Sequence, residues 1–196
     1  DPYSGFAPQT GNVAWWRPAV ALHAGVRVDD GIVEGGEVTP HYDPMVAKLI
    51  VHGEDRHDAI RRLMATLDST PLLGFKHNGR FLRDLVDHPA FREARMTTTL
   101  LDQWYEAGEP LLQRPVAPES AWPLAAALLA SSGDLGADGQ WRSGSVSGFD
   151  IVVEHGDEKR TLRIAGERSG ELVVGTSRIR ILGWEAGELR YVQDGI

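Results

Sequence analysis

The sequence contains no cysteine, which excludes a disulfide framework, a thiolate metal site and a cysteine nucleophile. Long apolar runs are missing too, because stretches such as AAALLA at 125–130 are far shorter than the roughly 20 residues that a membrane-spanning helix needs. The first residues, DPYSGFAPQTGN, have neither the basic start nor the apolar stretch of a secretory signal. We therefore expect no membrane partner and a cytoplasmic location.

A concentration of positive charge is also missing. The formal net charge is −8, and the acidic residues are spread over both halves of the chain. No polybasic stripe marks a surface for nucleic acid. We therefore expect no nucleic-acid partner.

Several common catalytic motifs are absent as well. None of the seven histidines has the spacing by which a helix presents two ligands to a metal ion. The string GFAPQTG lacks the lysine and the following helix of a phosphate-binding loop, and GSVSG at 144–148 lacks the strand-to-helix setting of a nucleophilic serine. We expect no metal site, and an independent hydrolase or metal enzyme is the weakest interpretation.

Turn signals and short apolar pieces alternate before Thr39, which predicts small strands joined by tight turns. The run MVAKLIVH at 45–52 is mostly apolar, which is typical of a central strand. We expect Lys48, which interrupts this run, to lie on the solvent face with its stem packed.

The hydrophobic period then changes to that of helices. Apolar residues recur every three or four positions in 54–70, which predicts an amphipathic helix that begins near Asp55. The string NGRFLRDLVDHP at 78–89 predicts a second helix with Asn78 as its N-cap. A third short helix is expected over 98–107.

A proline-rich stretch, 106–123, holds four of the eleven prolines and has no usable periodicity. It indicates a domain boundary, with a linker at 108–120. Beyond it we expect one helix in PLAAALLAS and then consecutive hairpins of an antiparallel sheet or barrel. The sequence therefore predicts an α+β chain with domains at 1–107 and 121–196.

The stretch TPHYDPM at 39–45 has the most chemical promise. Asp43 follows Tyr42 there, and the charged or titratable side chains around them are Arg27, Glu34, Glu37, His41 and Lys48. A carboxylate at a turn beside aromatic groups and cations could orient a substrate or a catalytic arginine. The carboxylate could instead form the turn by accepting backbone N–H bonds. The residue types alone favour this second interpretation.

Three strings carry a resemblance to a known family. They are DPYSGFAPQTG, then GVRVDDGIVEGGEVTPHYDPMVAKLIVHGEDRHDAIRRLMATL, then TPLLGFKHNGRFLRDLVDHPAF. In order and spacing they resemble the C-terminal part of the biotin carboxylase component of acyl-CoA carboxylases, over about residues 1–105. The chain is most similar to the biotin-carrying α subunits of 3-methylcrotonyl-, propionyl- or geranyl-CoA carboxylases. His41 departs from the family, in which many members have tyrosine.

The second half of the chain is similar to the domain that those α subunits place between the biotin carboxylase and the biotin carrier. In the family this domain is a helix encircled by an antiparallel barrel, and it contacts the carboxyltransferase β subunit. The matching features here are a linker, one helix, the pair Trp141 and Arg142, and the hairpins. The family barrel needs more strands than follow residue 121, so we expect a truncated barrel.

The resemblance also implies the cofactors and the parts that are absent. The intact family subunit carboxylates biotin with ATP, bicarbonate and Mg²⁺ or Mn²⁺. The ATP-grasp region and the Met-Lys-Met motif of the biotinylated lysine do not occur in this sequence. We therefore expect that the 196 residues alone bind no cofactor and have no turnover, and that the ATP-grasp and biotin carrier domains are their partners within one subunit.

The resemblance implies supporting roles for four residues and a catalytic role for none. It places Asp43, with Tyr42, near the floor of the carboxylase site, where Asp43 would support residues that bind biotin or orient a catalytic arginine. It places Arg27 at a subunit interface and Thr98 near the adenine side of the nucleotide. The alternative is a non-catalytic protein-interaction module, which the absent catalytic regions and exposed aromatic residues such as Trp184 would suit.

Overall fold

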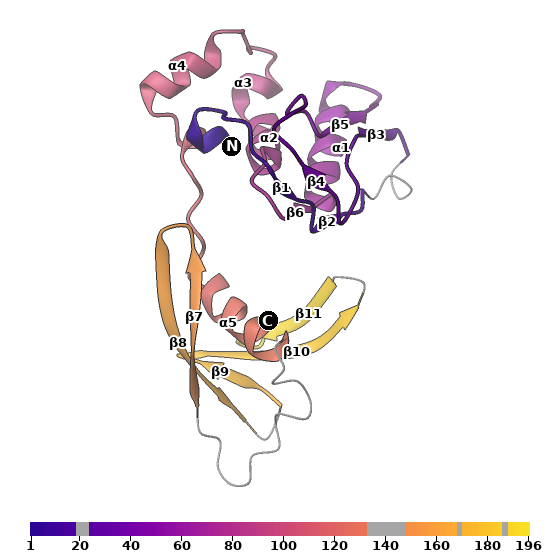
Figure 1. Cartoon of the computed structure of the whole chain (residues 1–196). Coiled ribbons are helices and arrows are strands. Elements are labelled where there is room, and N and C mark those ends of the chain that lie inside the picture. The colour runs from indigo at the N-terminus through magenta and orange to yellow at the C-terminus, as the bar shows by residue number, and fades with distance from the viewer. Residues whose placement is uncertain (19–23, 133–147, 168–169, 186–187) are drawn as a thin grey trace. The chain divides into compact units, whose positions relative to one another are not determined.

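The computed structural model describes residues 1–18, 24–132, 148–167, 170–185 and 188–196. The chain divides into two compact units, Asp1–Arg114 and Pro115–Ile196 (Figure 1). The pair Trp141 and Arg142, and most of the string GSVSG, lie outside the described residues. Within the described ranges, no helix is long and apolar enough to cross a membrane.

Short antiparallel strand pairs make up the sheet part of the first unit. The pairs are β1 (Gly11–Asn12) with β4 (Glu37–Val38), β2 (Trp15–Trp16) with β6 (Leu72–Leu73), and β3 (Val26–Asp30) with β5 (Ala47–Val51). The prediction of small strands is confirmed. Their inner side chains gather around a core of Val13, Trp16 and Leu72.

The prediction of a central strand at 45–52 is wrong. In the described part of the chain, β5 pairs with β3 alone. The strand is apolar for another reason: Ala47 and Leu49 pack against the core cluster, and helix α1 (Arg56–Ser69) contacts the strand. Lys48 lies on the exposed side, as predicted.

Helices follow where the period of 3.6 residues predicted them. Helix α1 begins next to Asp55, as predicted, and the carboxylate of Asp55 caps it by accepting the N–H of Asp58 at 2.8 Å. Helix α2 (Gly79–Asp87) begins after Asn78, but the Asn78 side chain makes no capping bond, and the ring of His77 accepts the N–H of Gly79 instead. The other helical elements among the described residues of the unit are η1 (Pro2–Ser4), α3 (Pro89–Arg92), α4 (Leu100–Ala107) and η3 (Pro110–Leu112).

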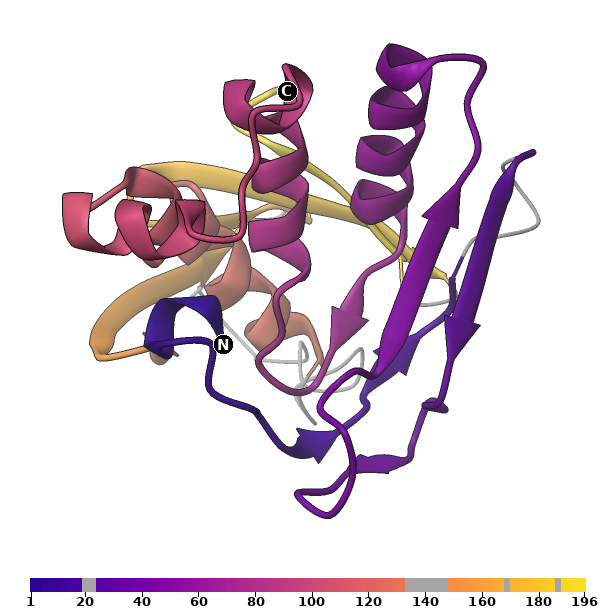
Figure 2. The same ribbon diagram turned by 90° about the horizontal axis from the view of Figure 1, so that it is seen from above.

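Helices α1 and α2 lie side by side, with the paired β3 and β5 next to α1 (Figure 2). Each helix buries apolar residues, Ile60 from α1 and Phe81 and Val86 from α2. The Nε of Arg83 lies 3.2 Å from a carboxylate oxygen of Asp68, which joins α2 to α1 at the surface. This packing holds the loop before α2, which forms part of the candidate site.

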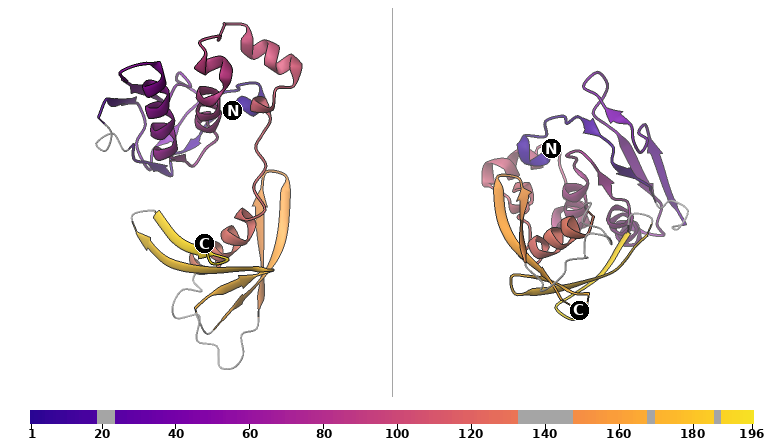
Figure 3. Two further views of the ribbon diagram at one scale, coloured as in Figure 1. Left: turned by 180° about the vertical axis from the view of Figure 1, so that it is seen from behind. Right: turned by 60° about the horizontal axis from the view of Figure 1, so that its bottom comes forward.

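In the second unit, the residues that the structure describes form one helix against one curled antiparallel sheet (Figure 3). The elements are α5 (Ala121–Ser132), β7 (Phe149–His155), β8 (Glu158–Gly166), β9 (Leu172–Val174), β10 (Ser177–Glu185) and β11 (Glu188–Gln193), and the strand order is β11-β10-β9-β8-β7. Ala126 and Ala127 of α5 are fully buried against Ile164, Val174 and Ile179 of the sheet. Small alanines let the helix approach the sheet closely, and the predicted consecutive hairpins are confirmed.

Candidate functional site

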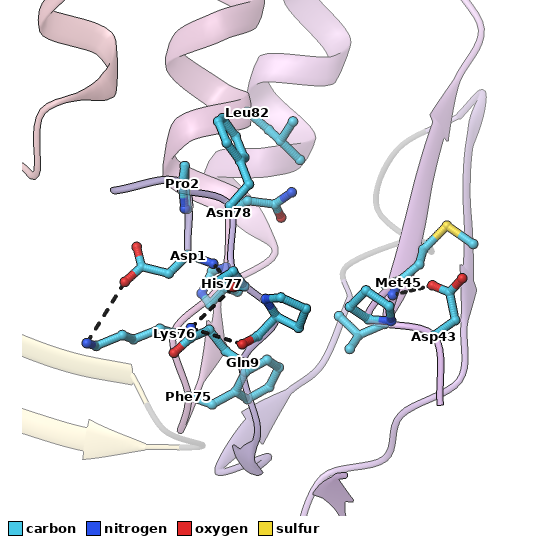
Figure 4. Close-up of a pocket in the computed structure, with 16 residues that line it drawn as sticks. Asp1, Pro2, Gln9, Asp43, Met45, Phe75, Lys76, His77, Asn78 and Leu82 are labelled. Carbon is cyan, nitrogen blue, oxygen red and sulfur yellow. Dashed lines mark hydrogen bonds and ion pairs between the residues drawn. The ribbon is translucent and has the colours of Figure 1, made fainter. Parts of the chain in front are cut away.

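A pocket of about 340 Å³ lies within the first unit (Figure 4). Residues 43–47 form one side of it, and residues 75–78 with Leu82 of α2 form the other. The N-terminal segment contributes residues 1, 2 and 6–9. Three segments that are far apart in the sequence therefore meet around one concavity.

Asp43 holds the first side of the pocket in shape. Its Oδ1 accepts the backbone N–H of Met45 at 2.7 Å, across Pro44. Such an Asx turn is the turn-forming role that the residue types favour. The neighbouring side chains remain accessible, since Tyr42 is 84% exposed and Met45 is 63% exposed.

His77 holds the opposite side. Its Nδ1 accepts the N–H of Gly79 at 3.0 Å, and its Nε2 lies 2.7 Å from the carbonyl oxygen of Leu72. Burial lowers the pKa of His77, and the bond to the Leu72 carbonyl opposes this only in part. The ring is therefore neutral at pH 7.

The carboxylate of Asp1 anchors the N-terminal segment. Its side chain is only 4% exposed and accepts bonds from the Nη2 of Arg114 at 2.7 Å and the N–H of Tyr3 at 3.1 Å. The Nζ of Lys76 lies 3.9 Å from the same carboxylate. The N-terminal segment is thus tied both to residues 75–78 and to the last residue of the first unit.

The lining combines apolar walls with a few polar groups. Phe6, Met45, Phe75 and Leu82 supply apolar surface, and the amide of Asn78 has no capping bond to the helix. A small pocket of this composition can hold a ligand or an apolar side chain by contact and orient it by hydrogen bonds. Among the described residues, no three His, Cys, Asp or Glu side chains are grouped so that they could hold a metal ion.

The other predicted site residues lie elsewhere in the unit. Arg27 is on the exposed side of β3, where its Nε lies 3.1 Å from a carboxylate oxygen of Asp29. Lys48 of β5 is opposite Asp29 in the register, so these three residues form one charged face of the strand pair. Thr98 is exposed in the turn before α4 and does not line the pocket.

Of the charged or titratable side chains considered with Asp43, none lines the pocket: Arg27, Glu34, Glu37, His41 and Lys48. Glu34 is bound by Arg17, whose Nη2 and Nε contact its two carboxylate oxygens at 2.7 and 2.8 Å. This pair lowers the pKa of Glu34 and raises that of Arg17, chiefly through their hydrogen bonds. Glu34 supports the strand pairs and does not line the pocket.

Sequence reasoning missed the second side of the pocket and the part that the N-terminal segment contributes. Lys76, His77 and Asn78 line the second side, Gln9 lies in the N-terminal segment, and none of these four residues was a candidate. The signal was available in the string KHNG, where a histidine comes two residues before the first residue of a helix. A histidine ring at that distance can reach the free N–H groups of the first helical turn.

Comparison with known sequences decides the family. Residues 1–103 match the sequence model of the family described as the biotin carboxylase C-terminal domain, and this is more than half of the 196 residues. The chain belongs to this family. The predicted resemblance to the biotin carboxylase of acyl-CoA carboxylases is thereby confirmed.

Named relatives agree with this assignment. The chain is 40% identical over 110 residues to the mitochondrial propionyl-CoA carboxylase alpha chain of Caenorhabditis elegans, covering 55% of this chain and 15% of that one. It is 40% identical over 100 residues to the mitochondrial methylcrotonoyl-CoA carboxylase subunit alpha of rice, Oryza sativa subsp. japonica, covering 51% of this chain and 13% of that one. The chain thus spans less than a fifth of the length of these relatives.

A solved structure supports the fold of the first unit. The biotin carboxylase domain dimer of the Hydrogenobacter thermophilus 2-oxoglutarate carboxylase, in complex with MgADP, ADP and bicarbonate, matches with a TM-score of 0.53 and 28% identity. The match covers 59% of this chain and 24% of that one. The first unit therefore has the fold of the C-terminal part of a biotin carboxylase domain.

Proposed function

We propose that this chain forms the C-terminal part of the biotin carboxylase domain in the α subunit of an acyl-CoA carboxylase. The observation that carries the proposal is the family match over residues 1–103, together with the 40% identity to a propionyl-CoA carboxylase alpha chain. In the complete subunit, ATP would activate bicarbonate, and biotin would supply the acceptor for its carboxyl group. The acyl-CoA that finally receives it is set by another part of the enzyme.

The chain's own contribution is to hold and shape one border of that site. The described residues contain no suitable group of metal ligands, so the Mg²⁺ or Mn²⁺ of the reaction would be held by other parts of the subunit. We therefore assign no step through the metal to these residues. Positioning is nevertheless a large part of phosphoryl transfer, because its barrier depends mostly on geometry and charge placement.

Within that border we assign supporting roles to the four predicted residues. Asp43 fixes the turn that presents Tyr42, and both would face the biotin side of the site. Arg27 would lie at a subunit interface, and its exposed position beside Asp29 leaves it accessible to a partner. Thr98 would approach the adenine side of the nucleotide, which its exposure permits.

The second unit would dock the carboxyltransferase β subunit. Its exposed apolar side chains support this, namely Leu129 on α5, Val152 on β7, Leu182 on β10 and Tyr191 on β11, which are 41–60% exposed. Exposed apolar groups of this size favour contact with another protein. The biotin carrier and ATP-grasp domains would be the further partners.

The cytoplasmic location remains a prediction, since relatives include chains named as mitochondrial and one from the bacterium Ruegeria pomeroyi.

The test compares the 196-residue chain with the complete α subunit that contains it. We expect the complete subunit to release ADP in a bicarbonate-dependent and biotin-dependent manner, and the 196-residue chain to release none. In the complete subunit, Asp43→Ala should lower the rate of biotin carboxylation, and Val33→Ala, at an exposed position outside the pocket, should not. A complete subunit without bicarbonate-dependent ADP release would refute the proposal.

A further inference from the structure

The ring of His77 makes two hydrogen bonds that require opposite roles of its nitrogens. Nδ1 can bond the N–H of Gly79 only as an acceptor, and Nε2 can bond the carbonyl of Leu72 only as a donor. Only the neutral ring with its proton on Nε2 satisfies both. A protonated ring would have two N–H donors, and one of them would face the N–H of Gly79.

These bonds connect two elements across the pocket wall. Leu72 lies in β6 and is buried, and Gly79 is the first residue of α2. The ring also packs closely on the helix start, because a Cβ at Gly79 would lie 2.9 Å from two ring atoms. Since His77 satisfies the helix N–H, the amide of Asn78 is left without a capping bond beside the pocket (Figure 4).

We propose that His77 is a positioning residue that fixes the 75–78 side of the pocket, and that protonation of its ring releases this side. Neutral His77 fastens the loop at both ends, to β6 and to α2. When Nδ1 gains a proton, the Gly79 N–H loses its acceptor and the start of α2 loosens. Asn78 and Lys76, which lie on either side of His77, then lose their fixed positions.

The surroundings of the ring favour its neutral form. Burial is the largest cause that lowers the pKa of His77. The charged side chains that line the same pocket are the carboxylates of Asp1 and Asp43 and the amine of Lys76. The Asp1 carboxylate is already engaged with Arg114 and Lys76, and one Asp43 oxygen is engaged with Met45.

The release itself does not depend on the proposed function, although its consequence for carboxylation does. If the pocket borders the carboxylase site, carboxylation should weaken as His77 becomes protonated. The two statements need separate measurements, one on the 196-residue chain and one on the complete subunit.

The first measurement follows the Gly79 amide of the 196-residue chain by NMR between pH 8 and pH 5. We expect the Gly79 resonance and the His77 ring resonances to titrate together, with a midpoint below 6.5. Hydrogen exchange at Gly79 should be roughly tenfold faster in the protonated form, after correction for the intrinsic pH effect, as expected when an N-cap bond is lost. A Gly79 amide that does not respond to the His77 titration would overturn the proposal.

Two variants separate the roles of the ring. His77→Asn keeps an acceptor near the position of Nδ1 but does not titrate, so Gly79 should stay protected at all pH values. His77→Ala should remove the protection at all pH values. If Gly79 exchanges equally in the wild type and in His77→Ala, the ring is not its cap and the proposal fails.

His88 provides a matched control in the same chain. Its Nδ1 accepts the N–H of Ala90 at 3.1 Å at the start of α3, and it does not line the pocket. His88→Ala should remove the protection of the Ala90 amide and leave the Gly79 titration unchanged. If the Gly79 titration disappears in His88→Ala, the effect belongs to His88 and the proposal fails.

The second measurement is the pH profile of biotin carboxylation by the complete subunit. His77→Asn should retain activity near pH 6 better than the wild type, relative to each at pH 8. The Gly79 amide could titrate as expected while the pH–activity profiles of the wild type and His77→Asn coincide. Protonation of His77 would then release residues 75–78, but this release would have no effect on the carboxylase site. A complete subunit that is inactive at every pH would instead refute the proposed function.

Discussion

The carboxylate of Asp43 bonds the N–H of Met45 in an exposed turn, so its contribution to stability is small and its value lies in the shape of that turn. We expect Asp43→Ala to lower the free energy of unfolding by about 0.5–1 kcal/mol, the usual range for one such hydrogen bond. Asp43→Asn should cost less, because an asparagine oxygen can accept the same bond. Urea denaturation measures both, and a loss in the alanine variant no larger than in the asparagine variant would contradict this account.

His77 gives the stability a specific dependence on pH. Its pKa is lowered from 6.5 in the folded chain, chiefly by burial, so the unfolded chain binds the proton more readily. The resulting stability is present above pH 6.5 and is lost as the pH falls through the lower, folded pKa. Urea unfolding at pH 7.5, 6.5 and 5.5 should show this loss in the wild type and a smaller one in His77→Asn. If the free energy of unfolding falls equally with pH in the wild type and in His77→Asn, this contribution of His77 is contradicted.

Two residue positions explain why the sequence revealed only one side of the pocket. Asp43 is recognisable because an aspartate before a proline is a local turn signal. His77 is less recognisable: its position two residues before the helix start suggests the bond to Gly79, but its partner in β6 is fixed only by the tertiary fold. Glu34 illustrates the opposite error, since proximity in sequence suggested a role beside Asp43 and Arg17 holds it elsewhere.

The starts of α1 and α2 differ in how their free N–H groups are satisfied. Asp55 caps α1 directly, whereas Asn78 at the start of α2 makes no such bond. We therefore expect Asp55→Ala to cost about 1 kcal/mol and Asn78→Ala to stay within about 0.5 kcal/mol. Thermal unfolding of the two variants tests this, and a larger loss for Asn78→Ala would show that the cap is assigned wrongly.

Helices were predictable because their period of 3.6 residues is a local property of the sequence. The number of strands that pair with β5 was not predictable. An apolar run has the same sequence pattern whether a second neighbouring strand buries it or a helix and a core cluster bury it. In this chain α1 and the cluster around Trp16 cover it. The hairpins of the second unit were predictable, since glycine-containing turns separate strands that pair with their neighbours in the sequence.

The core of the second unit depends on the contact of α5 with the curled sheet. Ile164 is fully buried against this helix, whereas Val152 on β7 is 46% exposed. We expect Ile164→Ala to destabilise the chain by about 2–5 kcal/mol and Val152→Ala by less than about 1 kcal/mol. Denaturant unfolding followed by tryptophan fluorescence measures both, because Trp122 lies in the same cluster. Similar losses at the two positions would contradict the described core.

At the scale of the whole molecule, the family assignment accounts for the fold of the first unit. The first unit has the fold of a biotin carboxylase C-terminal domain, and the chain spans about 15% of a relative such as the propionyl-CoA carboxylase alpha chain. Its pocket is lined by apolar side chains and a few polar groups, and the described residues include no group of three or more metal ligands. A supporting role within a larger carboxylase subunit is consistent with both facts.

The central claim is that these residues work as part of a biotin-carrying carboxylase subunit. The most direct test is to detect the protein in native cell extract with an antibody to this chain, and to probe the same species with streptavidin. We predict a biotinylated species several times larger than the 21.5 kDa of these 196 residues. A species of 21.5 kDa that carries no biotin would contradict the claim and would favour a protein-interaction module instead.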